Sequence, residues 1–166
     1  MTTPELVFSV LALIGAGGAV LLVTAKNVVH AALYLVVTLA AVAAVYLVLT
    51  SEFVAWTQVL IYVGAIVVLL LFSLMLTRAP IGREALDNQR RGVAFGVGLA
   101  VFGGLFYLLQ DAFPWKASEV DPVQGTAGAV GESIFRDFVL PFEAISFLLL
   151  AALIGAIVLS RKDDAP

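Results

Sequence analysis

The sequence predicts an all-α polytopic membrane protein, a single domain over residues 1–166 with five transmembrane helices. Of its 166 residues, 62% are hydrophobic and only 13% are charged, and the charged residues gather in short segments between long uncharged runs. A helix crosses the hydrocarbon with roughly 20 apolar residues, whereas a barrel strand needs only about 10 of alternating polarity. The runs are too long for strands, so helices are expected. The predicted spans are 6–23, 28–49, 53–77, 92–110 and 139–160.

The first span is expected to stay in the mature protein. No basic segment precedes it, and its apolar run is longer than the core of a signal peptide. Residues 111–137 are rich in glycine, proline and polar residues, which predicts an outer surface loop. The chain has no cysteine, which excludes disulfides and iron–sulfur ligation by its own thiolates.

The basic residues are distributed asymmetrically between the two ends of the predicted spans. With the N-terminus outside, only Lys116 and Arg136 of the nine basic residues lie outside. Because basic residues favour the cytoplasmic side, the N-terminus is expected to be periplasmic and the C-terminus cytoplasmic. This arrangement suits a multi-pass protein of the bacterial inner membrane. The inner basic residues are Lys26, Arg78, Arg83, Arg90, Arg91, Arg161 and Lys162.

Ionisable groups are nearly absent from the spans, although proton and ion carriers need them at membrane depth. Only His30 and Glu143 lie within a span, each about one turn from an end. His30 is either a packed interfacial histidine or a group that titrates at the aqueous edge. Glu143 follows Pro141, so it either stabilises the first helical turn or makes a contact in an assembly. We therefore expect no catalytic site, no metal or cofactor bound by this chain, and no nucleic-acid partner.

The third span contains polar residues where lipid cannot satisfy them. Tyr62 lies roughly 13 Å along the helix from its outer end at 1.5 Å per residue. Gln58 and Tyr62 are four residues apart and share a face, so each needs a polar partner there. Gly64 permits either close helix packing or a local departure from the α-helix such as a π-bulge. The sequence alone leaves these two alternatives open. The glycines of "GAGG" (15–18) and "GVGLAVFGG" (96–104) also allow close helix packing.

Three motifs carry a resemblance to a known family. "QVLIYVGAIVVLLLFSLML" in the third span, "LPFEAISFLLLAALIGAIVLSRK" at the C-terminus and "KNVVHAAL" before the second span resemble the J subunits of bacterial NADH-quinone oxidoreductase. These respiratory complex I subunits are equivalent to mitochondrial NADH dehydrogenase subunit 6. The resemblance covers the first three spans and the last, whereas the fourth matches only in apolar character, length and position.

The resemblance implies a non-catalytic membrane subunit of a redox-driven proton pump. NADH, FMN, iron–sulfur clusters and quinone are then held by other subunits. The implied partners are the quinone-cavity subunit, the small K-type subunit and the antiporter-like subunits, all within the lipid bilayer.

The resemblance also assigns roles within the third span. Tyr62, Val63, Gly64 and Ala65 match the family's bulge motif, and the residues at 67–69 match the segment that rotates when the bulge converts to regular α-helix. This conversion is implied to gate the axial water path. Glu143 matches the glutamate of the family's "PFE" motif, and participation of Glu143 or His30 in proton transfer stays open. The rotating residues are Val67, Val68 and Leu69.

Two other classes of function stay open beside this one. An accessory membrane subunit of a multi-subunit cation/proton antiporter is the alternative, since such subunits resemble J subunits. A free-standing small transporter or membrane enzyme is disfavoured by the scarcity of ionisable groups in the spans. The motifs "IYVGA" and "PFEAIS" favour the oxidoreductase subunit over the antiporter subunit.

Overall fold

The computed structural model describes residues 3–76, 91–113, 123 and 125–161. Five helical segments in this part of the chain are long and apolar enough to cross a membrane, as the sequence predicted. The third segment, Glu52–Leu76, is continuous but consists of three elements. The elements are α1 (Thr3–Thr24), α2 (Val28–Val48), α3 (Glu52–Thr57), η1 (Gln58–Ile66), α4 (Val67–Leu76), α5 (Arg91–Ala112), α6 (Ala127–Arg136) and α7 (Val139–Ser160).

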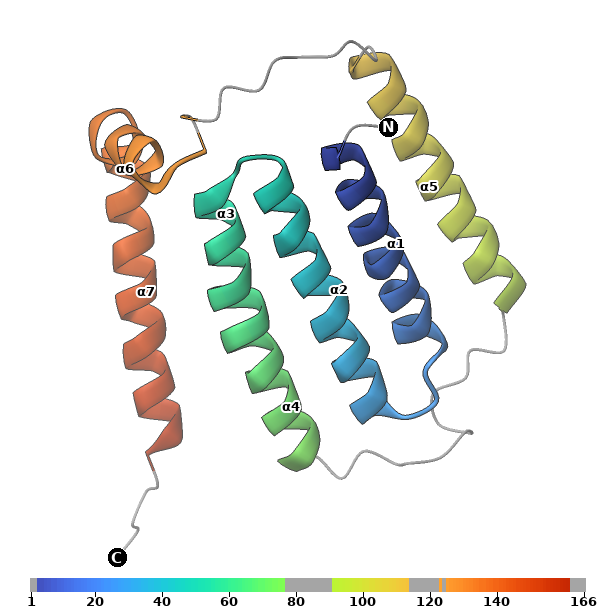
Figure 1. Cartoon of the computed structure of the whole chain (residues 1–166). Helices are drawn as coiled ribbons and strands as arrows, with labels where there is room; N and C mark the ends of the chain where they lie inside the picture. Colours follow the sequence, from blue (N-terminus) through green and yellow to red (C-terminus); the bar gives the residue numbers. More distant parts are fainter. Residues whose placement is uncertain (1–2, 77–90, 114–122, 124, 162–166) are drawn as a thin grey trace, which may run out of the picture.

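The spans α1, α2 and α3–α4 lie side by side, whereas α5 and α7 stand apart from these three (Figure 1). α2 lies at the centre, where it contacts α1 on one side and α3, η1 and α4 on the other. Among the described helices, α5 contacts none of the others and α7 contacts only α6. The chain therefore has a packed unit of three spans, flanked by two spans that need other surfaces to cover them.

Glycines determine how closely α1 approaches α2. Gly18 is buried, and a Cβ at this position would lie 2.7 Å from Thr38 Oγ1, whose hydroxyl donates to Tyr34 O. A Cβ at Gly15 would lie 3.4 Å from Ala41 Cβ. The "GAGG" motif thus provides the close packing that the sequence allowed. The glycines of α5 show no such contact, because a Cβ at any of 96, 98, 103 and 104 would meet nothing described within 4 Å.

The segment 111–137, predicted as an outer loop, contains regular structure that the sequence reading missed. α5 continues to Ala112, and a further helix, α6, begins after Thr126. The Thr126 hydroxyl accepts a hydrogen bond from Ala129 N–H at 3.4 Å, the usual N-cap arrangement. α6 has only ten residues and two glycines, so its helical signal is weak in the sequence.

The start of α7 agrees with the predicted span, but Pro141 is not its first residue. The helix begins at Val139, two residues before Pro141, with Phe138 as its N-cap. Pro141 is tolerated there because proline has no N–H, and an amide in the first turn would have no intrahelical acceptor in any case. Glu143 is consequently the fifth helical residue rather than a first-turn residue. Glu143 thus lies beyond the first turn, where the helix-end effect fades, and the contact in an assembly is the alternative that stays open for it.

Very little of the described apolar surface is buried within the chain. The buried hydrophobic residues are Ala32, Ala41, Ala43, Ala55 and Val67. Large apolar side chains stay exposed all around α5 and α7, for example Phe102 at 68% and Leu148 at 67%. Such extended apolar surface indicates contact with lipid or with other protein chains.

Candidate functional site

The described feature of greatest functional interest is a π-helical stretch in the middle of the third span. η1 covers Gln58–Ile66, and at its end Val67 N–H donates to Tyr62 O, five residues back instead of four. The stretch contains Tyr62, Gly64 and the other residues that match the bulge motif. Of the two alternatives for Gly64, the backbone departure is the one present here. A Cβ at Gly64 would lie 3.4 Å from Val59 O, the carbonyl five residues before it.

The π-helical stretch decides which residues of this span face α2. Ala55 and Val67 are almost fully buried, with 2% and 1% exposure. Ala55 lines a groove together with α2 residues, and α2 is the one described helix outside its own span that α4 contacts. In a regular α-helix of about 100° per residue, positions twelve apart lie about 120° apart around the axis. One extra residue in the intervening turns reduces that offset to about 20°. The π-helical stretch thus keeps Ala55 and Val67 on the same face.

The polar residues of the stretch lie partly open at the surface of the chain. Gln58 is half-buried and Tyr62 is 47% exposed. Farther along, Val68 and Leu69 are also exposed, at 43% and 70%. In a membrane, these side chains meet lipid or a neighbouring chain, and the phenol and amide require a polar partner there.

The other predicted site residues do not join this stretch. His30 is exposed in the first turn of α2, just after the Asn27 N-cap. Glu143 is exposed on α7, which contacts none of the described elements of the Glu52–Leu76 span. Among the described residues, no three His, Asp or Glu side chains gather into a group that would hold a metal ion.

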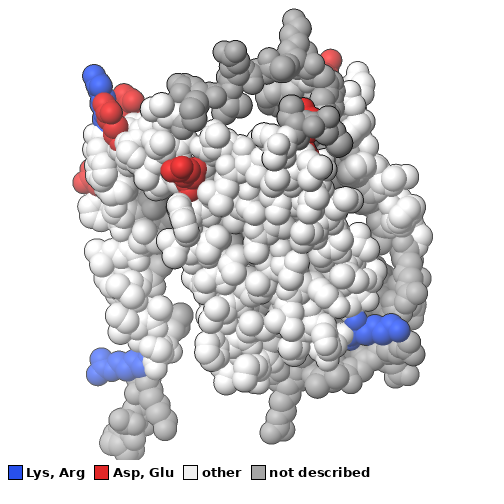
Figure 2. Space-filling view, in the orientation of Figure 1, with Lys and Arg blue, Asp and Glu red and all other residues white. Residues whose placement is uncertain are grey.

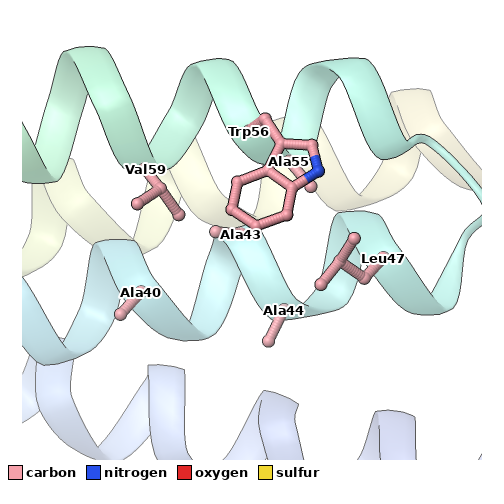
Figure 3. Close-up of a pocket in the computed structure, with 7 residues that line it drawn as sticks. All are labelled: Ala40, Ala43, Ala44, Leu47, Ala55, Trp56 and Val59. Atoms are coloured by element: carbon pink, nitrogen blue, oxygen red, sulfur yellow. The ribbon is translucent and has the colours of Figure 1, made fainter. Parts of the chain in front are cut away.

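A small apolar groove adjoins the π-helical stretch (Figure 3). Its volume is about 220 Å³, and the Trp56 ring lies beside the alanines of α2. Val59 connects the groove to the stretch, since its carbonyl is the one nearest Gly64. Sequence reasoning missed this groove, although the alanine-rich run of α2 is a signal for close approach of a neighbouring helix. The groove is lined by Ala40, Ala43, Ala44, Leu47, Ala55, Trp56 and Val59.

Charge separates between the two ends of the described helices (Figure 2). Glu5, Glu52 and Asp111 lie at the end where α1 begins. Lys26 and Arg161 lie at the opposite end, where α1 and α7 finish. Arg136 is a basic residue at the acidic end, and it pairs with Glu132 at 3.4 Å on the exposed surface of α6. The predicted inner residues Arg78, Arg83, Arg90 and Lys162 and the outer Lys116 fall outside the described part of the chain.

Comparison with known proteins identifies the family. The family model for NADH-ubiquinone/plastoquinone oxidoreductase chain 6 matches residues 18–159. The chain belongs to this family. Taken with the five apolar helices, membership makes the chain a multi-pass membrane subunit of an oxidoreductase complex. The resemblance to J subunits drawn from the sequence is thereby confirmed.

Chain 6 relatives align over nearly the whole sequence. NAD(P)H-quinone oxidoreductase chain 6 of Leptolyngbya boryana is 40% identical over 163 residues, covering 96% of this chain and 80% of the relative. The chain 6 protein of Synechocystis sp. is 37% identical and covers 96% of this chain and 81% of its own length. F(420)H(2) dehydrogenase subunit J of Methanosarcina mazei is 37% identical over 165 residues, covering 95% of this chain and 90% of the relative.

Proposed function

We propose that this chain is a non-catalytic membrane subunit of a proton-translocating NADH-quinone oxidoreductase, and that it helps couple quinone reduction to proton pumping. The coupling element is the span Glu52–Leu76, which converts between the π-helical form and a regular α-helix. The observation that carries the proposal is the π-helical stretch between Ala55 and Val67, both buried on one face. Two discrete packings of one element are what a conformational switch requires.

Conversion to a regular α-helix shifts the register of α4 by one residue. With α3 held in place, the helix beyond the stretch rotates by about 100°. Each side chain now turned toward α2 is then replaced by the residue before it. The present set is Val67, Leu71 and Leu74, which are buried or half-buried, and the replacing set is Ile66, Leu70 and Ser73. On the face toward α2, the rotation replaces Leu74 by the hydroxyl-bearing Ser73. It also moves Val68 and Leu69 relative to the neighbouring subunit.

The rotation gives a physical basis for gating water. Apolar side chains in a narrow passage exclude water, and their withdrawal admits it. The exposed Val68 and Leu69 are the side chains that we propose to close and open the axial water path between subunits. Gly64 leaves room beside the Val59 carbonyl: a single Cβ there would lie 3.4 Å from this oxygen, whereas a branched side chain would add methyl groups to the same turn.

The phenol of Tyr62 is proposed to hold the π-helical form through a partner outside this chain. Changing Tyr62→Phe should lower quinone-coupled proton pumping about fivefold, because one buried hydrogen bond contributes about 1 kcal/mol to the balance between the two helical forms. Pumping would be measured in proteoliposomes of the complete complex. Tyr107→Phe on α5, where the ring is 71% exposed, is the matched control and should pump like wild type. Equal pumping in the two variants would remove Tyr62 from the proposal.

The partners follow from the uncovered spans and from family membership. α5 and α7 present apolar surface that we assign to other membrane subunits, namely the quinone-cavity, K-type and antiporter-like subunits. NADH, FMN, the iron–sulfur clusters and quinone are assigned to those and other subunits. The absence of cysteine from the sequence supports this for the clusters, whose ligands are mostly thiolates.

We further propose that the acidic end of the chain is periplasmic and the basic end cytoplasmic, in a bacterial inner membrane. The charge separation in Figure 2 supports this orientation. A reporter active only in the periplasm should work when fused after Arg136 and be silent when fused after Arg161. The reverse pattern would invert the topology.

A further inference from the structure

We propose that the segment from Gly125 through α6 is a clamp at the acidic end of the molecule, which fixes α7 to the outer end of the π-containing span. The inference concerns how α7 is positioned, and it does not depend on the transition proposed above. Among the described elements, α6 is the one that contacts both α3 and α7.

The first contact of the clamp is a backbone hydrogen bond at the turn between α2 and α3. Phe53 N–H donates to Gly125 O at 3.1 Å. Phe53 is the second residue of α3, so its amide has no acceptor within the helix and needs one from elsewhere. Gly125 therefore caps the first turn of the span that contains the π-helical stretch.

The approach of Gly125 is too close for any other residue. A Cβ at position 125 would overlap the Thr50 carbonyl oxygen and would lie 2.9 Å from Ser51 Cα. Both neighbours are backbone atoms of a tight turn in which Thr50 has a φ of 59°, a left-handed conformation. Backbone atoms of such a turn cannot move aside as a flexible side chain can. A side chain at position 125 must therefore push the segment that begins at Gly125 away from this turn.

The second contact of the clamp is a pair of aromatic rings, one on α6 and one on α7. The ring centroids of Phe135 and Phe142 lie 4.9 Å apart in an edge-to-face arrangement. This geometry stabilises aromatic pairs. Along its remaining length α7 contacts no other described helix. The position of α7 relative to the three packed spans is therefore set by this one segment within the chain.

Hydrogen–deuterium exchange on the complete complex tests the clamp. Gly125→Ala should raise the exchange rate of the Phe53 amide about tenfold, because its acceptor is displaced. It should also raise the exchange of the first hydrogen-bonded amides of α7, beginning with Phe142, whose N–H donates to Phe138 O. Gly128→Ala is the matched control, since a Cβ there would meet nothing within 4 Å and exchange should match wild type. Unchanged exchange in Gly125→Ala, or an equal rise in Gly128→Ala, would overturn the proposal.

A second variant covers the case in which Gly125→Ala fails to assemble. Phe135→Ala removes the contact with α7 while leaving Gly125 in place. The amides of α7 from Phe142 through the following turn should then exchange several-fold faster, while the Phe53 amide keeps its wild-type protection. If the α7 amides exchange as in wild type, α6 does not hold α7.

Discussion

Gly64→Val should abolish most of the proton pumping coupled to quinone reduction. In the π-helical form, a Cβ at this position already lies 3.4 Å from Val59 O, and the two methyl groups of valine add to the crowding. Overpacking of this kind costs about 1–3 kcal/mol. That cost shifts the ratio of the two helical forms about five- to hundredfold toward the regular α-helix.

Proteoliposomes of the complete complex, with proton uptake and quinone reduction followed together, provide the measurement. Gly64→Ala is the graded control, because a single Cβ at 3.4 Å requires only a small adjustment and should leave pumping near wild type. Wild-type turnover and wild-type stoichiometry of protons to electrons in the valine variant would contradict the proposed role of the stretch.

Gly18→Val should remove the subunit from the complex or leave it poorly assembled. A Cβ at position 18 would lie 2.7 Å from the Thr38 hydroxyl oxygen, and that hydroxyl is held by its bond to Tyr34 O. The helices α1 and α2 must separate to accept valine, which costs about 1–3 kcal/mol or more in lost packing.

The amount of subunit retained in the purified complex, together with its thermal stability, tests this prediction. Gly17→Val is an adjacent control in the same helix, since a Cβ at Gly17 would meet nothing within 4 Å. Similar losses in both variants would show that β-branching in α1, rather than the contact with Thr38, is responsible.

The spans were predictable because each one satisfies a length and polarity requirement that the bilayer imposes on any chain. For the same reason, the predicted ends of the spans lie within a few residues of the observed helix ends. Thr126 and the short α6 were not predictable, since ten residues with two glycines give almost no helical signal. The start of the last span at 139 was predictable from its apolar run, whereas the place of Pro141 inside the first turn was not, because proline fits any position whose amide has no intrahelical acceptor.

The candidate site could be located from the sequence but not described. Gln58, Tyr62 and Gly64 are conspicuous in an apolar helix, and the family resemblance pointed to the turn after Tyr62. What sequence could not show is that Ala55 and Val67 are the buried pair, because helical periodicity places residues twelve apart on different faces. The clamp at Gly125 depends on a contact between segments distant in the sequence, which no local pattern reveals.

The most direct test of the central proposal is the acceptor of the Val67 amide, traced in structures of the complete complex at rest and during turnover. In the form described here Val67 N–H donates to Tyr62 O. The proposal predicts a second state in which Val67 N–H donates to Val63 O and Ile66 replaces Val67 against α2. A bond to Tyr62 O in every state, with Val67 buried throughout, would contradict it.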